Sequence, residues 1–133
     1  MIDQPRVGLG DLPFASKGDL GLDKRRVTQC ALSRICGACA KSLGRPVVFV
    51  GSAEEGARNA FHFPPMHREC AEHAVAHWAL SWSASMGHPS QPESWVMVTT
   101  SGFEFVRQNA DVVDRRPVFS PNSVLAEESV PVG

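Results

Sequence analysis

The chain has 133 residues, with 13 basic and 14 acidic side chains and a formal net charge of −1. This length suits one compact domain and is too short for two independent cores. The balanced charge lacks the basic footprint of a protein that holds phosphate backbones, so charge does not favour nucleic acid as the partner.

No apolar run in the sequence is long enough to cross a membrane, and we expect no membrane association. Residues 1–30 also lack the charged start and the apolar core of a signal peptide. We therefore expect a cytoplasmic protein. In a reducing compartment, four cysteines favour metal binding over disulfide bonds.

The first part of the chain predicts an irregular arm and then a helix. Residues 1–22 place sparse apolar side chains between Gly, Pro and Asp residues, which disfavours regular structure. Residues 23–34 have apolar side chains at helical spacing, and Asp23 stands before them as the expected N-cap.

The middle of the chain predicts a hairpin and a second helix. Residues 36–46 form a glycine-rich turn, and residues 47–50 then make a β-branched and aromatic strand. A polar loop at 51–59 and a return strand at 60–63 complete the expected hairpin. Two prolines follow, and an amphipathic helix is expected over residues 66–84.

The last part of the chain predicts a second hairpin and an acidic tail. Strand-forming runs on either side of Ser101-Gly102 predict a hairpin over residues 94–108. Residues 109–133 contain three prolines, scattered valines and acidic side chains, so we expect a partly loose tail. The folded zinc-binding domain is then expected over residues 23–108.

Two pairs of metal-ligand residues carry the clearest chemical signal, Cys36-x2-Cys39 and His67-x2-Cys70. The first pair lies in a tight turn of small residues, which lets both sulfurs point to one side. The second pair begins a helix, where i, i+3 spacing puts both side chains on one face. Four nitrogen and sulfur ligands of this kind suit one structural Zn²⁺ without a coordinated water.

The segments CGACAKSLGRP at residues 36–46 and FPPMHRECA at 63–71 carry a family resemblance. A turn with two ligands, a hairpin and a helix with two ligands together resemble the treble-clef zinc finger superfamily over residues 36–84. The pattern also looks like that of small uncharacterised bacterial and phage zinc-binding proteins. The resemblance implies a fold element and a metal, and no activity. The turn that carries the first two ligands, residues 36–46, is called the knuckle below. Glycine commonly follows the second cysteine of such a knuckle, and Ala40 takes its place here.

Other residues offer competing ligands. His73 and His77 are spaced i, i+4 and would form a Cys2His2 set with Cys36 and Cys39, but the pairs lie much further apart than the usual ~12 residues. Cys30 precedes the knuckle and is expected as a buried thiol, with a fifth metal contact or a redox role as the alternatives. Reduced core cysteines without any metal remain the alternative for the whole cluster.

Three further features have a structural and a functional interpretation. His62 resembles the water-activating histidine of His-Me-type nucleases, but an outward-facing polar residue on the hairpin is the simpler interpretation. Trp78 and Trp82 are expected in the core, with an exposed partner anchor as the alternative. Short basic runs at residues 24–26 and 115–116 are expected to be solvated, with a phosphate contact as the alternative.

These expectations combine into a small α+β fold, a zinc-centred treble clef with an N-terminal helix and a C-terminal β-hairpin. One structural Zn²⁺ bound by Cys36, Cys39, His67 and Cys70 would replace part of the missing core. We expect a zinc-binding, non-enzymatic protein-interaction module, of the phage or bacterial accessory type, with a protein partner. A nucleic-acid-binding regulator with a structural zinc is the alternative, and a metal-dependent nuclease is the third hypothesis.

Overall fold

The computed structural model describes residues 12–107 and 116–131, and expectations that fall on other residues lie outside it. Its helices and strands are, in chain order, η1 (Gly18–Leu20), α1 (Lys24–Ser33), β1 (Val47–Ser52), α2 (Ala53–Arg58), α3 (Arg68–Ala74), η2 (Val75–Ala79), η3 (Ser83–Met86), β2 (Ser94–Thr100), β3 (Phe103–Val106), β4 (Val118–Pro121) and β5 (Val124–Pro131). Helices together with antiparallel sheets confirm the α+β class. Within the described ranges, every helix is too short or too polar to traverse a lipid bilayer.

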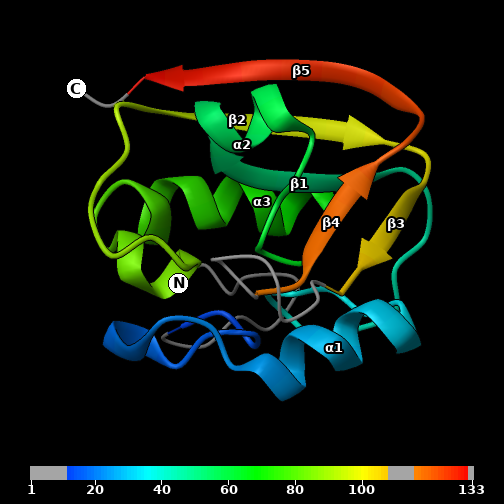
Figure 1. The fold of residues 1–133 in the computed structure, drawn as a ribbon, viewed down its shortest axis with the longest axis horizontal. Helices are drawn as coiled ribbons and strands as arrows, with labels where there is room; N and C mark the ends of the chain where they lie inside the picture. Colours follow the sequence, from blue (N-terminus) through cyan, green and yellow to red (C-terminus); the bar gives the residue numbers. More distant parts are fainter. Residues whose placement is uncertain (1–11, 108–115, 132–133) are drawn as a thin grey trace, which may run out of the picture.

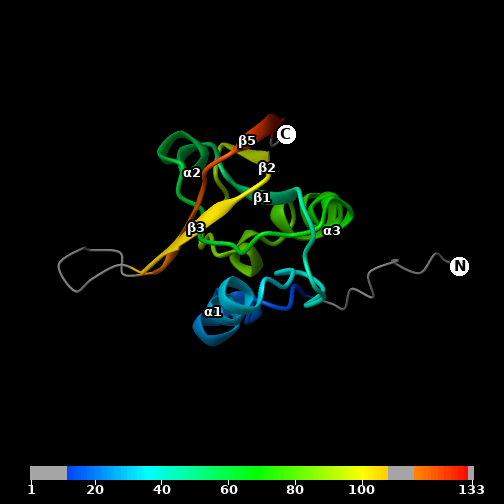
Figure 2. The same ribbon diagram turned by 90° about the vertical axis from the view of Figure 1, so that its right-hand side faces the viewer.

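The larger sheet has three antiparallel strands in the order β1-β2-β5. β2 is central, because Met97 stands opposite Val50 of β1 and also opposite Glu128 of β5. Figure 1 shows β5 at the outer edge of this sheet, and Figure 2 shows α2 and α3 on its opposite faces. β3 and β4 pair with each other in a separate two-stranded sheet.

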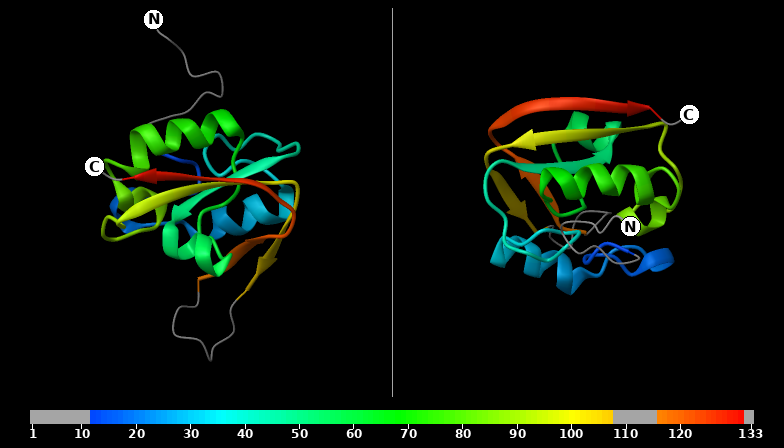
Figure 3. Two further views of the ribbon diagram at one scale, coloured as in Figure 1. Left: turned by 90° about the horizontal axis from the view of Figure 1, so that it is seen from above. Right: turned by 180° about the vertical axis from the view of Figure 1, so that it is seen from behind.

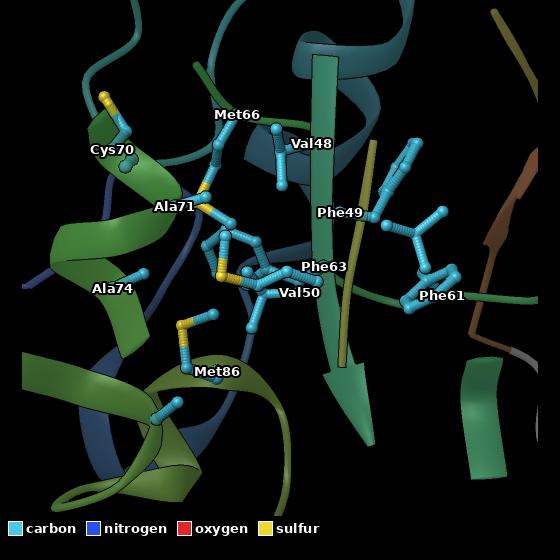
Figure 4. Packing of buried hydrophobic residues seen from close by; sticks show 14 of the residues in the cluster. Val48, Phe49, Val50, Phe61, Phe63, Met66, Cys70, Ala71, Ala74 and Met86 are labelled. Atoms are coloured by element: carbon cyan, nitrogen blue, oxygen red, sulfur yellow. The ribbon is translucent and has the colours of Figure 1, made fainter. Parts of the chain in front are cut away.

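The core occupies both faces of β1. Because successive side chains of a strand point to opposite faces, Val48 and Val50 turn toward α3 while Phe49 turns to the other side (Figure 4). On that second side, the ring of Phe49 stacks on Phe61 with centroids 5.5 Å apart and lies 5.8 Å from the ring of Phe119. β1 is therefore buried along its whole length.

The predicted first helix is confirmed as α1, and Asp23 caps it. The Asp23 carboxylate accepts hydrogen bonds from the backbone N–H groups of Arg25 and Arg26, at 3.0 and 3.2 Å. Arg34 ends the helix in the left-handed conformation with φ of 52°, and its backbone N–H donates to the Cys30 carbonyl. The chain then turns directly into the predicted knuckle.

Residues 12–45, called the N-terminal layer below, lie mostly beneath the two sheets at the end of the molecule opposite β5, and the last of them rise to β1 (Figures 1 and 3). The N–H of Phe14 donates to the Ala38 carbonyl at 3.1 Å, and that of Ala15 donates to Gly37 at 3.0 Å. The irregular arm expected over residues 1–22 is therefore, in its described part, hydrogen-bonded to the turn that follows α1.

The hairpin predicted from residues 47–50 and 60–63 does not form. β1 pairs with β2 instead, and residue Phe61 makes only an isolated bridge, to Phe119. The polar loop predicted at 51–59 is largely the helix α2, because Ser52 and Glu55 form a reciprocal capping box that begins a helix there. Among the described residues, the strand pairing expected of the treble-clef hairpin is thus not formed.

The hairpin predicted over residues 94–108 is also wrong in its pairing. β2 and β3 are both strands, but β2 pairs with β1 and β5, while β3 pairs with β4. The Ser101-Gly102 turn therefore sends the chain into a second sheet rather than back along the first. Within the tail predicted to be partly loose, β4 and β5 are regular strands.

The predicted helix over residues 66–84 is helical but not continuous. It comprises α3, the π-helical turn η2 and the 3-10 turn η3. The break before η3 falls at Trp82, whose backbone adopts φ of −153°. Gly87 ends the segment in the left-handed conformation, as the sequence suggests.

Candidate metal centre

Four side chains meet where the N-terminal layer contacts the start of α3: Cys36, Cys39, His67 and Cys70. One ligand atom from each lies within 4.8 Å of all the others. The two pairs predicted from spacing are therefore brought together, although the expected hairpin between them is absent. Cys36 and Cys70 are fully buried, and Cys39 and His67 are partly exposed.

The first pair is positioned by the turn that follows α1. The backbone N–H of Cys36 donates to the Lys41 carbonyl at 2.9 Å, and that of Ala40 donates back to the Cys36 carbonyl at 2.9 Å. Gly37 lies between the cysteines, against Phe63 and Pro64. A Cβ atom on Gly37 would lie 2.9 Å from the Phe63 ring, so the close approach requires glycine.

The second pair is positioned by the register between β1 and the residue before α3. Val48 and Met66 exchange two backbone hydrogen bonds of 2.9 Å, which fixes the start of the helix against the sheet. His67 is the N-cap residue of α3, and Cys70 lies in its first turn. Their i, i+3 spacing turns both side chains toward the knuckle.

The ring of His67 is oriented by both of its nitrogen atoms. Nε2 lies 2.8 Å from the Ser42 carbonyl and therefore carries the proton that it donates. Nδ1 is then the unprotonated nitrogen, and it lies 3.5 Å from the Cys39 sulfur and 3.7 Å from the Cys70 sulfur. A carbonyl partner of this kind commonly fixes the tautomer of a metal-binding histidine.

These distances fit a tetrahedral zinc ion. With Zn–S near 2.3 Å and Zn–N near 2.0–2.1 Å, a regular tetrahedron separates its nitrogen and sulfur ligands by about 3.6 Å. The two sulfur-to-nitrogen distances measured from His67 agree with this edge length. The cluster can therefore hold a metal ion, and its sulfur-rich ligand set suits zinc.

The electrostatics of the cluster also favour a cation. Hydrogen bonds from the Cys70 thiol and from three backbone N–H groups lower the pKa of Cys36 to about 5, against the effect of its burial. The Cys36 sulfur as acceptor raises the pKa of Cys70, and burial raises the pKa of Cys39. The protein itself thus stabilises one thiolate, while ionising the other two thiols requires additional positive charge.

The competing ligands do not join the cluster. His73 and His77 face each other with ring centroids 4.3 Å apart and are not part of the metal-ligand group, so the Cys2His2 alternative is wrong. Cys30 is fully buried, as predicted, and burial raises its pKa to about 12. Burial and this raised pKa leave Cys30 an inert thiol.

His62 is not the outward-facing residue that the sequence suggests. Its side chain is buried, at 7% exposure, and Nδ1 lies 3.2 Å from the Pro117 carbonyl. Within residues 12–107 and 116–131, His62 does not belong to any cluster of metal ligands. This placement gives no support to the nuclease hypothesis, which requires a second metal beside that histidine.

The tryptophans of the second helix divide between core and surface. Trp78 is buried, at 3% exposure, as predicted. Trp82 is partly exposed, and its indole N–H donates to the Asp19 carboxylate at 2.6 Å. Trp82 therefore links η3 to the N-terminal layer, which is a second connection besides the metal cluster.

Sequence reasoning missed one group beside the site and one on the opposite face of the sheet. Ser42 contributes its carbonyl to His67, and a backbone acceptor of this kind leaves no signal in the sequence. Glu55 is a buried carboxylate that accepts from the backbone N–H of Ser52 and of His62 and lies 3.0 Å from His88 Nε2. The Ser52-x-x-Glu55 pattern is the capping-box signature that could have revealed it.

The chain has no significant match to a protein-family model, to a curated protein sequence or to a solved structure. The metal cluster is compatible with a zinc finger, but no family comparison assigns it to the treble-clef superfamily.

Proposed function

We propose that this protein is a non-enzymatic interaction module whose fold depends on one structural zinc ion held by Cys36, Cys39, His67 and Cys70. The observation that carries the proposal is the set of four converging nitrogen and sulfur ligand atoms. Four such ligands complete a tetrahedral site and leave no position for a substrate or a reactive water. The closed site supports a structural role over a catalytic one.

The zinc ion would act as a bridge between two parts of the fold. Cys36 and Cys39 belong to the N-terminal layer, whereas His67 and Cys70 belong to the start of α3. Metal-binding free energy therefore becomes folding free energy for the contact between them. Of the treble-clef arrangement, we retain only the order of the elements that carry the ligands, a turn followed by a helix. Thiol ligands stay reduced in the cytoplasm, where we place this role.

The proposed partner is a protein, and the outer edge of β5 supports this choice. Among the described residues, no strand pairs with that edge, and residues 122–129 are exposed. Val124 and Leu125 are 49% and 64% exposed there. An open strand edge with apolar side chains can accept an extended segment of another protein. We propose an accessory role of this kind in a bacterium or a phage.

Native mass spectrometry of the protein, recovered gently from its own cells, tests both parts of the proposal. We expect one zinc ion per chain and one stoichiometric protein partner. The substitution Leu125→Ser should release the partner and retain the zinc, whereas the matched control Leu20→Ser should retain both.

The two parts can fail separately. Folded protein without zinc would contradict the structural metal. Zinc-loaded protein whose partner survives Leu125→Ser would contradict the docking strand and leave the metal site intact.

A further inference from the structure

The fold separates charges that balance over the whole sequence. The N-terminal layer contains seven basic and two acidic residues. The other described residues, 46–107 and 116–131, contain four basic and eight acidic residues. The basic residues of the layer are Lys17, Lys24, Arg25, Arg26, Arg34, Lys41 and Arg45. The formal net charge of −1 therefore conceals a basic end and an acidic remainder.

Most of these cations are exposed and make no ion pair within the described residues. Arg26 is held by the Phe14 carbonyl and ring, and Arg34 lies over the ring of Phe103 at 5.1 Å. The other five have exposed side chains that no acidic side chain approaches within ion-pair distance in the described part of the chain: Lys17, Lys24, Arg25, Lys41 and Arg45. Their charges are available to an external anion.

The stability of α1 does not explain why three cations lie together at its beginning. Basic side chains in the first turn oppose the helix dipole, typically by about 0.3–1 kcal/mol each. Lys24, Arg25 and Arg26 occupy that turn, and no acidic residue does. Asp23 already accepts hydrogen bonds from the free backbone N–H groups of this turn. An anion that docks here would therefore contact the basic side chains rather than the helix backbone.

The helix α1, which carries Lys24 and Arg25, lies at one end of the molecule. In Figures 1 and 2, α1 is the outermost element at the end opposite β5, which carries Glu127 and Glu128. The Lys41 carbonyl accepts a hydrogen bond from the backbone N–H of Cys36. The metal-binding turn therefore holds the backbone of one of the basic residues in place. The acidic residues of β5 therefore lie at the other end of the molecule from a polyanion that docks on α1.

We propose that the N-terminal layer is a docking face for the sugar-phosphate backbone of nucleic acid, read without sequence preference. A helix of ten residues is about 15 Å long. Duplex DNA of that length carries on the order of nine phosphate charges, enough to meet every free cation of the layer. Cations spread over a helix and a loop suit positioning contacts to phosphates rather than readout of base edges. This inference rests on the zinc-built layer of the proposed function and is independent of the protein partner.

Fluorescence anisotropy with a labelled random-sequence DNA duplex of about 20 base pairs, and with single-stranded RNA of similar length, tests the proposal. If four of the five free cations contact phosphates, the affinity for duplex should fall on the order of 100-fold between about 50 and 200 mM salt. Lys24→Ala/Arg25→Ala should reduce the slope of log affinity against log salt by about two. The matched control Arg58→Ala, which removes an exposed cation outside the layer, should leave the slope unchanged.

A second control separates nucleic acid from other anionic surfaces. Leu32 is 69% exposed at the end of α1, and Leu32→Ser should leave nucleic-acid affinity unchanged because phosphate contacts do not require it. Vesicles of anionic phospholipid that bind more tightly than DNA, and lose binding with Leu32→Ser, would assign the face to a membrane and overturn the proposal.

Zinc content measured on the same samples distinguishes the two proposals. Zinc-loaded, folded protein that binds neither probe, or binds them equally with and without Lys24 and Arg25, overturns the nucleic-acid face alone. Protein that folds without zinc overturns the proposed function, whatever the anisotropy shows.

Discussion

Ala40 adopts a backbone conformation that favours glycine. Its φ is +66°, in the left-handed region, where a Cβ atom crowds the following carbonyl oxygen. The N–H of Ala40 still donates to the Cys36 carbonyl, so the knuckle turn forms with alanine in place of the usual glycine. The metal ligands on either side keep their positions, and the strain falls on a single residue.

Substituting Ala40→Gly should therefore stabilise the zinc-loaded protein by about 1 kcal/mol. The matched control is Ala57→Gly in α2, where glycine should destabilise by about 1 kcal/mol because it loosens a helix. Urea unfolding of the two variants and the parent gives both values. A loss of stability with Ala40→Gly would show that the turn does not strain Ala40.

Cys70 and Cys30 are both buried thiols, but only Cys70 belongs to the metal cluster. Structural zinc contributes about 10–16 kcal/mol to the folding of small zinc-finger peptides, which equals or exceeds the total stability of about 5–15 kcal/mol of most domains. Cys70→Ser should therefore release the zinc and unfold the domain. Cys30→Ala should keep one zinc per chain and lose about 1–2 kcal/mol, as for a small core truncation.

Zinc analysis and thermal unfolding by circular dichroism measure these effects. Retention of one tightly bound zinc by Cys70→Ser, with an unchanged melting temperature, would exclude Cys70 as a ligand. A loss of zinc with Cys30→Ala would instead extend the cluster to Cys30.

At the scale of single elements, α2 depends on one buried carboxylate. Glu55 completes the capping box with Ser52 and also accepts from the backbone N–H of His62. Burial alone would raise the pKa of Glu55. The hydrogen bond from His88, its charge when it is protonated, and the hydrogen bond from the Ser52 N–H outweigh burial and hold the pKa below its ordinary value of 4.5. Glu55 therefore holds α2, residue 62 and residue 88 together in its ionised form.

Substituting Glu55→Gln should destabilise the protein by about 1–3 kcal/mol at neutral pH, because hydrogen bonds to a charged group are lost in a buried site. Since the folded pKa lies below the unfolded value, the carboxylate contributes fully above pH 4.5 and less as the pH falls through the folded pKa. The stability difference between parent and variant should thus narrow as the pH falls below 4.5.

Urea midpoints of both proteins across this range provide the measurement. The matched control Glu54→Gln changes a neighbouring exposed carboxylate and should leave stability nearly unaltered. A difference between parent and Glu55→Gln that grows as the pH falls below 4.5 would contradict the direction of the pKa shift.

Local sequence patterns predicted several helices and strands correctly, but they did not predict which strands pair with each other. The helical spacing and the cap at Asp23 predict α1, and β-branched runs predict β1 and β2. Strand pairing joins residues that lie far apart in the chain. β2 follows β1 after more than forty residues, whereas the predicted hairpin paired β1 with the nearer residues 60–63. β5 was missed because most of its side chains are exposed, so it shows no alternation of apolar and polar residues.

The metal cluster was predictable because its signal is local chemistry. Two pairs of ligands at fixed spacing each impose their own geometry, whatever strand order brings the pairs together. The separation of charge was not predictable from composition. It arises because residues 12–45 fold as one layer, and only the fold places α1, with Lys24 and Arg25, at the end of the molecule opposite β5.

On the scale of the whole molecule, the N-terminal layer is attached to the remaining fold at a few identifiable places. The metal cluster joins the knuckle to α3, and Gly37 N–H donates to the Pro65 carbonyl beside it at 2.9 Å. Elsewhere in the layer, the Asp19 carboxylate accepts a hydrogen bond from the Trp82 indole. The three-stranded sheet, by contrast, is held by its own ladders and by packing on α3.

Removing zinc should therefore release the layer before it disrupts the sheet. Without a cation, the three cysteine sulfurs and His67 are no longer joined by a common metal ion. Repulsion between thiolates, or their protonation, then weakens the contact between the layer and α3. The large sheet keeps its backbone hydrogen bonds and the aromatic cluster of Phe49, Phe61 and Phe119. Regions of different local stability of this kind exchange amide hydrogens at different rates.

Hydrogen–deuterium exchange with a zinc chelator at neutral pH measures this order. We expect amides of residues 24–45 and of the first turn of α3 to lose protection first, while β1 and β2 remain protected. Trp82→Phe removes the indole bond to Asp19 and should enlarge the effect after chelation, with little change while zinc is bound. Simultaneous loss of protection in the layer and in β2 would show instead that the metal holds a single cooperative unit, in which the sheet cannot persist without the layer.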